Sequence, residues 1–247
     1  MKSVIIDADF ASDVGDLGGV ALACAAHRMG MVNIIGAIYC ASATKGPGSM
    51  SACLNYWGVT PSIGTWKGAS GQTIDEDGWS GQTWMTYLYD NYTRQVGLAS
   101  TVTDSTVQYR ALLATSTTKV DIITTGYMQC LSALLDSPAD SISSLSGAQL
   151  VTAKVRHLWV MGGQYTSGTE FNLCGGANLG GNYTANSAYF CAASNNVAAN
   201  WPTPITWCGY ELGTFACGGT SLWSSGTLMY DAYSQAGYPS GRTAWDE

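Results

Sequence analysis

The sequence predicts a single α/β domain with a mostly parallel central sheet flanked by helices. The first observation is that short apolar, strand-like runs alternate with helix-like segments along all 247 residues. A strand–helix–strand order implies right-handed crossovers, which place the strands parallel in one sheet that is buried on both faces. The second observation is that apolar residues make up 46% of the chain, enough for a sizeable core. The length suits one large α/β domain, so we expect a single domain over residues 1–247.

The first third of the chain begins this alternation. A turn signal, Thr60-Pro61, precedes the third strand, and the polar, tryptophan-rich stretch 66–84 is predicted to be a long excursion rather than a linker. The strands are expected at residues 4–6, 32–40 and 62–64. The helices are expected at residues 17–29 and 49–57.

The rest of the chain continues the pattern. One helix is stopped by Ser137-Pro138, and one strand ends in Gly162-Gly163. The strands are expected at residues 120–124, 157–161 and 205–208. The helices are expected at residues 108–114, 128–135 and 222–235. Ligands bind beyond the carboxyl ends of the strands in sheets of this kind, so functional residues are expected there.

The composition argues against two classes of partner. The formal net charge is −7 and the isoelectric point about 4.6, whereas a protein that binds nucleic acid is expected to carry a basic surface. No apolar run approaches the roughly 20 residues that span a bilayer, so no membrane partner is expected. The N-terminal residues MKSVIID also lack the long apolar region of a signal peptide.

Two features favour an extracellular location slightly over a cytoplasmic one, and the compartment stays open. The glycosylation sequence NYT occurs at residues 91–93 and again at 182–184. Of the eight cysteines, Cys174, Cys191 and Cys217 lie in glycine-rich or irregular surroundings and are candidates for disulfides. The others lie in apolar runs that are typical of buried free thiols, namely Cys24, Cys40, Cys53, Cys130 and Cys208.

A cluster of aspartates follows the first predicted strand, in the stretch IDADFASDVGD at residues 6–16. It holds Asp7, Asp9, Asp13 and Asp16, although only 11% of the chain is charged. Four carboxylates at one strand end repel each other by several kcal/mol in a partly desolvated cleft unless a cation lies among them. Oxygen ligands without imidazole or thiolate favour a hard cation, Ca²⁺ before Mg²⁺. The alternative is that some of these aspartates only cap the following helix or solvate the turn.

The chain resembles the nucleoside hydrolase family of the inosine–uridine-preferring type. The stretch DADFASDVGDLGGVAL resembles the opening motif of a divergent branch, DxDxxxDVDDxxAL, and four further stretches follow in family order. Residues 120–138 resemble the strand-TGPLTNLA segment, residues 157–172 the VMGG…EFN segment, residues 200–213 the next strand, and GRTAWD at 241–246 the late SWD/HD motif. The resemblance implies Ca²⁺-dependent hydrolysis of the N-glycosidic bond of ribonucleosides to ribose and free base.

The resemblance also implies a set of metal ligands. Asp9, Asp16 and Asp246 would bind Ca²⁺ through their carboxylates, and Thr125 would bind it through its backbone carbonyl. Asp7 would support these ligands from behind and orient them. The ligand would be a nucleoside or another small molecule that contains ribose, and the family's common dimers and tetramers imply a homo-oligomer.

The same resemblance implies how the nucleoside is held. Glu170 and Asn172 of the EFN triplet would hydrogen-bond the ribose hydroxyls, and Met161 would pack beneath the sugar. Three tryptophans in the excursion are candidates for stacking on the base, Trp66, Trp79 and Trp84.

The sequence departs from the family at several positions. Gly15 stands where the branch usually carries the aspartate that activates water, so the catalytic base is expected to be Asp13. Trp245 replaces a histidine that often protonates the leaving base. CASAT at 40–44 lacks the family's ribose-contacting asparagine, and the chain stops at Glu247 where family members continue with a helix. We therefore expect a domain shortened at its C-terminus.

These departures leave two alternatives to an active enzyme. One is a catalytically impaired protein of this fold that serves as an extracellular structural or assembling protein. Gly15, Trp245 and the low charge favour it. The other is a module that binds a nucleoside or sugar without hydrolysing it, since a fold alone does not determine function.

Overall fold

A seven-stranded sheet, parallel throughout, forms the centre of the molecule, in the strand order β4-β3-β2-β1-β5-β6-β7. The computed structural model of the chain describes residues 1–11, 14–68, 72–78, 82–165, 170–174, 187–214, 217–218, 224–238 and 242–243. The strands are β1 (Lys2–Ala8), β2 (Val32–Tyr39), β3 (Ser62–Thr65), β4 (Thr103–Asp104), β5 (Val120–Thr124), β6 (Val155–Met161) and β7 (Ile205–Cys208). A separate antiparallel pair is made by β8 (Cys217–Gly218) and β9 (Arg242–Thr243).

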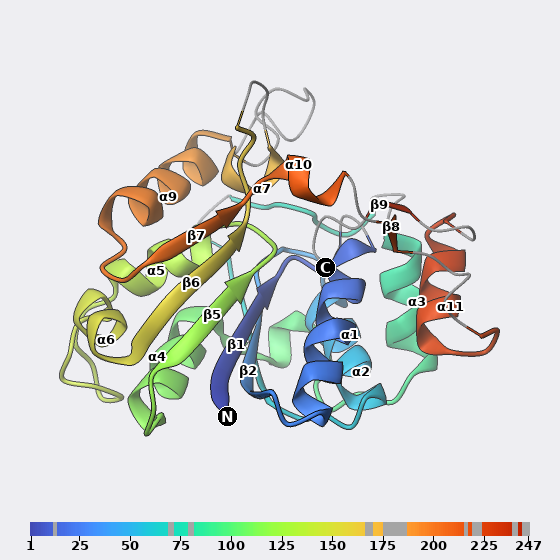
Figure 1. Cartoon of the computed structure of the whole chain (residues 1–247), viewed down its shortest axis with the longest axis horizontal. Helices are drawn as coiled ribbons and strands as arrows, with labels where there is room; N and C mark the ends of the chain where they lie inside the picture. The colour runs from blue at the N-terminus through green and yellow to red at the C-terminus, as the bar shows by residue number, and fades with distance from the viewer. Residues whose placement is uncertain are drawn as a thin grey trace.

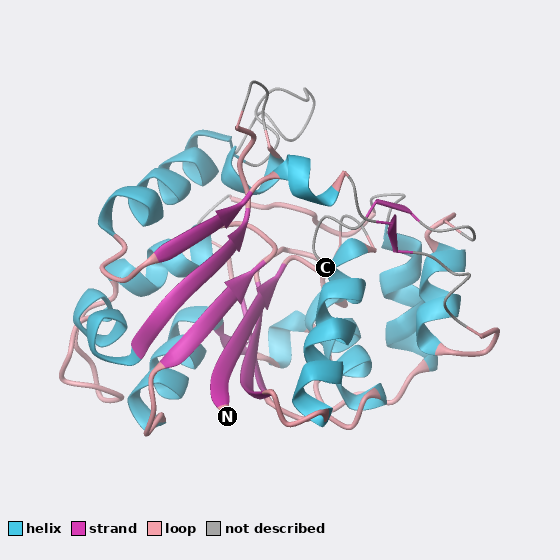
Figure 2. Ribbon diagram, in the orientation of Figure 1, coloured by secondary structure: helices cyan, strands magenta, loops and turns pink. Residues whose placement is uncertain are grey.

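Helices lie on both sides of this sheet (Figures 1 and 2). On one side, α1 (Gly15–Arg28) and α2 (Gly46–Tyr56) contact β2, while α3 (Thr83–Asn91) contacts α2 and α11 (Leu228–Gln235). On the other side lie α4 (Ser105–Thr115), α5 (Gln129–Asp136), α6 (Gly147–Lys154) and α9 (Ser187–Asn200). The short helices are η2 (Ala99–Thr101), α7 (Phe171–Cys174) and α10 (Tyr210–Gly213). The expected α/β architecture is therefore confirmed.

The central strand β1 is apolar because its residues from Val4 onward are buried on both faces of the sheet. In β1, Ile5 pairs with Ile122 of β5 and Ile6 pairs with Ile123. The side chains of Ile5 and Ile122 are completely buried. A continuous apolar run, rather than an alternating one, is what burial on both faces of a parallel strand requires. This is why short runs of Val and Ile marked the strands in the sequence.

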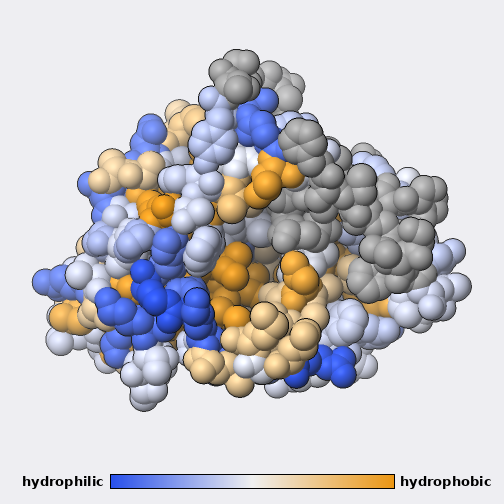
Figure 3. All heavy atoms as spheres, in the orientation of Figure 1, coloured by the Kyte–Doolittle hydropathy of each residue, from blue (hydrophilic) through white to orange (hydrophobic). Residues whose placement is uncertain are grey.

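The strands β5, β6 and β7 lie in front of α4, α5, α6 and α9, and no described helix covers their near face in the view of Figure 1. Trp159 of β6 is 39% exposed. Its ring stacks on His157 at a centroid distance of 4.2 Å, and His157 Nε2 lies 2.8 Å from Thr206 Oγ1. Figure 3 shows apolar residues at the centre of this face and hydrophilic ones beside them. His157 is thus engaged in a structural contact.

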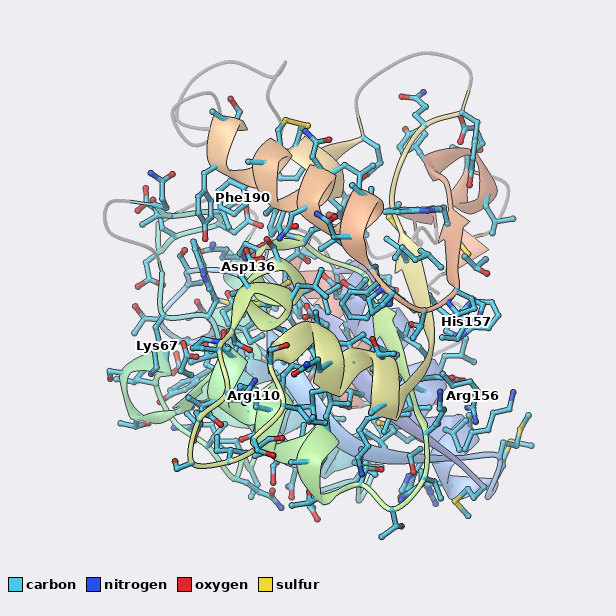
Figure 4. The ribbon with its side chains drawn as sticks, turned by 90° about the vertical axis from the view of Figure 1, so that its left-hand side faces the viewer. Lys67, Arg110, Asp136, Arg156, His157 and Phe190 are labelled. Atoms are coloured by element: carbon cyan, nitrogen blue, oxygen red, sulfur yellow. A yellow bond between two sulfur atoms is a disulfide. The ribbon has the colours of Figure 1, made fainter. Side chains whose placement is uncertain are left out.

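The loop between α5 and α6 is held by one buried arginine, Arg110 of α4, which is 1% exposed (Figure 4). Its guanidinium makes a two-pronged ion pair with Asp140, with both N···O distances 2.8 Å, and donates to Ser137 Oγ at 2.9 Å. It also donates to the backbone carbonyls of Ser143 and Leu145. An internal network of this kind fixes the loop to the helix, because leaving a buried guanidinium unpaired is costly.

Most predicted elements occur, and the differences are instructive. The strands at 120–124 and 205–208 have the expected bounds, and the other predicted strands differ by only a few residues at their ends. Several described elements were not predicted: the strands β4, β8 and β9, the helices α3, α6 and α9, and the short helices η2, α7 and α10. The last helix begins at Leu228 rather than at 222, and residues 222–223 lie outside the described part. No helix in the described part of the chain is long and apolar enough to cross a membrane.

The cysteines follow the sequence-based expectation wherever the structure describes them. Cys174 and Cys191 form a disulfide that joins α7 to α9. The four thiols of Cys24, Cys40, Cys53 and Cys130 are free and buried, and Cys208 is free and partly buried. The side chain of Cys217 lies outside the described part of the chain. Of the two NYT sequences, Asn91 ends α3 on the surface, while Asn182 lies in a stretch that is not described.

Candidate functional site

The candidate site lies at the carboxyl edge of the sheet, where β1, β5 and β6 end. Asp9 follows β1 and is 3% exposed, Asp16 lies in the first turn of α1 and is 2% exposed, and Thr125 directly follows β5. Parallel strands bring their carboxyl ends to the same edge, which is where ligands bind in such sheets. Residues far apart in the sequence therefore meet at this edge.

Asp16 joins the end of β1 to the end of β5. Its Oδ1 accepts a hydrogen bond from Thr125 Oγ1 at 2.5 Å, and its Oδ2 accepts one from the Phe10 backbone N–H at 3.1 Å. Phe10 has a φ of 38°, a left-handed conformation that non-glycine residues seldom adopt. Strained backbone of this kind persists where the surrounding structure fixes it, and it is enriched at ligand sites. The loop after β1 is thus held tightly against the loop after β5.

Thr125 is the central residue of the site. Its N–H donates to the carbonyl of Asp7 at 2.9 Å, and its own carbonyl accepts from Asn172 Nδ2 at 2.7 Å. The next residue, Gly126, packs directly on Asp9, because an added Cβ would lie 2.7 Å from the Asp9 backbone nitrogen. Only glycine fits this contact without a shift of the backbone. In the sequence TG at 125–126, the threonine therefore provides the carbonyl that Asn172 binds, and the glycine lets the loop after β5 pack closely on Asp9.

The EFN segment is brought to Thr125 by a direct contact. Asn172 Nδ2 lies 3.2 Å from the Met161 carbonyl and 3.3 Å from Met161 Sδ, in addition to its bond to Thr125. Glu170 accepts the backbone N–H groups of Asn172 at 2.7 Å and of Gly163 at 3.0 Å. Burial raises the pKa of Glu170, and these backbone hydrogen bonds oppose the rise. Glu170, Asn172 and Met161 thus form one cluster with Thr125.

The carboxylate of Asp7 is bound by a side chain of α4. Its side chain is completely buried, and its Oδ2 accepts a hydrogen bond from the Tyr109 hydroxyl of α4 at 2.5 Å. Burial raises the pKa of Asp7 to about 7, and the Tyr109 hydroxyl and the Cys40 thiol partly offset this rise. The backbone of Asp7 still contacts Thr125 through its carbonyl. The Asp7 backbone thus contacts Thr125, while its carboxylate contacts Tyr109 and the Cys40 thiol.

One carboxylate at this edge was not singled out in the sequence. Asp75 lies in the stretch 66–84, is 6% exposed, and accepts the Tyr127 hydroxyl on its Oδ2 at 2.8 Å. The loop after β2 holds the segment in place through two hydrogen bonds. Ser42 Oγ accepts the Ile74 backbone N–H at 2.9 Å, and the Ser42 backbone N–H donates to the Ile74 carbonyl at 2.8 Å. Nothing in the local sequence predicted this contact.

Aromatic side chains form one wall beside the site. Trp66 stacks on Tyr189 of α9 at a centroid distance of 6.3 Å, and Phe190 lies 5.8 Å from Trp66 and 5.7 Å from Tyr127. Phe190 lies beneath α9 in Figure 4. Trp84 cannot stack on a ligand, because it is completely buried with its ring 4.9 Å from that of Phe10. Trp79 lies outside the described residues.

The ligand set expected for a metal is only partly described. Asp13, the expected base, and Asp246, the expected fourth ligand, both lie outside the described residues. The described part supplies the Asp9 and Asp16 carboxylates and the Thr125 carbonyl, and within it no group of three or more His, Cys, Asp or Glu side chains is arranged to hold a metal ion. The donors present are all oxygen atoms, which fits the preference of a hard cation such as Ca²⁺.

No protein-family model matches the sequence, and no sequence of a curated protein matches it either. The structure is similar to solved structures. The inosine-uridine preferring nucleoside hydrolase from Bacillus anthracis aligns with a TM-score of 0.69 and 15% identity, over 100% of this chain and 79% of that one. The purine-preferring ribonucleoside hydrolase from Gardnerella vaginalis aligns with a TM-score of 0.62 and 15% identity, over 98% of this chain and 77% of that one.

A third similar structure is the type III effector protein XopQ complexed with adenosine diphosphate ribose. It aligns with a TM-score of 0.66 and 15% identity, over 94% of this chain. This chain spans 65% of the length of that effector and 62% of the length of a second effector protein. At these identities the likeness shows the fold alone. The chain therefore has a nucleoside hydrolase-like fold, as its sequence motifs predicted.

Proposed function

We propose that this protein is a Ca²⁺-dependent hydrolase that cleaves the N-glycosidic bond of ribonucleosides and releases ribose and the free base. The observation that carries the proposal is the chain of hydrogen bonds from Asp16 through Thr125 to Asn172. These contacts join three segments whose motifs resemble one family at one edge of the sheet. The two similar hydrolases named above support the reaction class.

Four residues would hold the metal. They are Asp9, Asp16 and Asp246 through carboxylates, and Thr125 through its carbonyl. A carbonyl oxygen has two lone pairs and a carboxylate about four acceptor sites, so the hydrogen bonds to Thr125 and Asp16 leave room for a cation. When bound, Ca²⁺ would lower the pKa of a water molecule and anchor the ribose diol.

The sugar would be held by the EFN cluster. Glu170 is fixed by two backbone N–H groups, so its carboxylate has little freedom to move and is suited to orient ribose hydroxyls. Asn172 is fixed by its own donor, because its Nδ2 donates to the carbonyls of Thr125 and Met161. Met161 would contribute an apolar surface beneath the sugar ring. Surrounding carboxylates would stabilise the positive charge that develops on the ribose.

The leaving base would depart without help from an imidazole. The chain has only two histidines. His157 is stacked on Trp159 near the start of β6, and His27 Nδ1 accepts the Ile34 N–H at 3.1 Å. Both contacts lie away from the carboxyl edge. Release of the base would therefore depend on how well the base itself carries the electron pair.

The test is release of reducing sugar from a panel of purine and pyrimidine ribonucleosides, with Ca²⁺ and with EDTA. We expect turnover that EDTA abolishes and Ca²⁺ restores, and a much lower rate with 2′-deoxynucleosides, which lack half of the diol. Asn172→Ala should raise KM, and Asn33→Ala, an exposed position on β2, is the matched control. No turnover of any ribonucleoside by metal-loaded protein would rule the proposal out.

A second candidate is binding of a ribose-containing ligand without turnover. Gly15 favours it, because it carries no side chain at the position expected for the base. The effector complexed with adenosine diphosphate ribose is also of this fold. Calorimetry with adenosine diphosphate ribose and with a nucleoside separates the two candidates, since a binding protein shows saturable heat and no released sugar.

A further inference from the structure

Asp75 is held at the carboxyl edge by contacts from several segments. Ser42, in the loop after β2, forms hydrogen bonds in both directions with Ile74. Gln82 Nε2 donates to the carbonyl of Asp75 and to that of Glu76, both at 3.0 Å. A carboxylate on an unconstrained surface loop would be free to reach solvent. This one is fixed, and it is buried.

The backbone at Asp75 is also in an uncommon conformation. Its φ is 48°, and in the described part of the chain only Phe10 shares a positive φ among non-glycine residues. Both residues lie in loops at the same edge of the sheet. Aspartate, asparagine and glycine tolerate this left-handed conformation better than other residues do. Substitutions by asparagine or glycine therefore change the side chain while the backbone can stay as it is.

Tyr127 links Asp75 to the proposed metal ligands. Its hydroxyl donates to Asp75 Oδ2 at 2.8 Å, within the protein interior. The preceding residue, Gly126, packs on the backbone and Cβ of Asp9. The carbonyl of Ala8, next to Asp9, accepts the N–H of Cys40, two residues before Ser42. Two separate series of contacts thus connect the segment that carries Asp75 to the loop that carries Asp9.

The electrostatics of two tyrosines agree with this placement. Burial raises the pKa of Tyr39 and of Tyr127, and the negative charges of Asp75 and Asp9 raise both further. Tyr39 is completely buried, and its hydroxyl proton has no acceptor among the described residues. A buried donor without an acceptor costs free energy, which a polar ligand beside it would recover. The Asp75 and Asp9 carboxylates thus lie near enough to Tyr39 and Tyr127 for their negative charge to raise the pKa of both hydroxyls.

We propose that Asp75 is the general base of the hydrolysis and replaces the aspartate that the resembled family carries at the position of Gly15. This inference rests on the function proposed above. In the step, the water oxygen forms a bond to the anomeric carbon of the ribose as the bond from that carbon to the base nitrogen breaks. The electron pair goes to the base, and the proton of the water goes to the Asp75 carboxylate. Tyr127 holds that carboxylate in position through its hydroxyl.

The experiment compares four forms of the metal-loaded, full-length protein on the nucleoside that the parent hydrolyses fastest. They are the parent, Asp75→Asn, Asp75→Gly, and the control Glu76→Gln, which removes a neighbouring charge at an exposed position. Folding is checked by thermal unfolding, and Ca²⁺ affinity by calorimetry. The glycine variant is also assayed with added formate, a small carboxylate that can occupy the space left by the side chain.

We expect both Asp75 variants to lose about 10²- to 10⁴-fold in kcat, with KM and Ca²⁺ affinity within about threefold of the parent. Formate should raise the kcat of Asp75→Gly by at least about tenfold and leave the kcat of the parent unchanged. A purely structural role of Asp75 would not give this rescue. Glu76→Gln should keep parental activity. A folded Asp75→Asn with parental kcat would overturn the role of Asp75 alone. A parent that hydrolyses no nucleoside would overturn both this role and the proposed function.

Discussion

The substitution Gly126→Ala tests the packing that brings the loop after β1 to the loop after β5. The added Cβ would lie 2.5 Å from Cys40 Sγ and 2.7 Å from the Asp9 backbone nitrogen. The thiol can turn away, but the backbone nitrogen cannot move alone. Reaching an ordinary contact of 3.4 Å requires the Asp9 backbone to shift by about 0.7 Å. The shift would carry the Asp9 carboxylate away from Thr125 and Asp16.

Two magnitudes follow from this shift. Overpacking of a well-packed interior costs about 1–3 kcal/mol, which for a chain of this length lowers the melting temperature by roughly 2–12 °C. A misplacement of about 1 Å at a reacting centre costs about 10²-fold in rate, so a shift somewhat smaller than this should cost about 10- to 100-fold in kcat/KM. Ca²⁺ affinity should fall as well, because Asp9 is one of the proposed ligands.

The measurements are thermal unfolding, Ca²⁺ calorimetry and kcat/KM. The control is Gly97→Ala, where the added Cβ would lie 3.5 Å from Thr101 Oγ1, an ordinary contact. Gly97→Ala should resemble the parent in all three measurements. If Gly126→Ala bound Ca²⁺ and turned over substrate within twofold of the parent, the contact between Gly126 and Asp9 would not position the site, and the reasoning would be wrong.

Three further predictions concern acid stability, the disulfide and the leaving group. The Arg110 guanidinium lowers the pKa of Asp140 from its ordinary 3.8 to about 2. The contribution of this ion pair to the free energy of unfolding is therefore complete above about pH 4 and is lost as the pH falls toward 2. In urea unfolding, the stability of Asp140→Asn should depend less on pH in that range than the stability of the parent does. Breaking the Cys174–Cys191 bond frees α7, which carries Asn172, so reduction should weaken nucleoside binding more than Ca²⁺ binding in calorimetry, whereas equal losses would contradict this assignment. Without an imidazole acid, a riboside with a nitrophenolate leaving group should be hydrolysed at least about 10²-fold faster than inosine, and similar rates would reveal an acid elsewhere.

The sequence predicted the central strands well because their signal is local. The run VDIIT at 120–124 is rich in β-branched residues and lies between polar segments, so its bounds were clear. The helix α9 was missed for the opposite reason. Its sequence, SAYFCAASNNVAAN, mixes five alanines, which favour a helix, with five serines and asparagines, which are weak helix formers and obscure the local signal. Tertiary contacts override this preference, since Phe190 and Val197 are buried and α9 packs against α5.

The candidate site could be predicted only where motifs mark it. Thr125, Glu170 and Asn172 lie in segments with a recognisable order, and the structure brings the three together. Asp75 carries no such mark. Its place depends on Ser42 and Tyr127, which lie far from it in the sequence, and on a left-handed backbone conformation that sequence patterns do not specify. Contacts between loops of this kind follow from the packed fold and not from local preference.

The structure also changes the meaning of the aspartate cluster. The sequence suggested four like charges at one strand end, but Asp7 contacts Tyr109 of α4, and burial raises its pKa to about 7. It therefore contributes less repulsion than a surface carboxylate would. Asp75 reaches the same region from a loop that is distant in the sequence. Its negative charge, together with that of Asp9, raises the pKa of Tyr39 and of Tyr127. Among the described residues, Asp9, Asp16 and Asp75 thus contribute to the negative potential that would favour a cation. Asp75→Asn should weaken Ca²⁺ binding far less than Asp16→Asn does, because Asp16 is a proposed ligand and Asp75 is not.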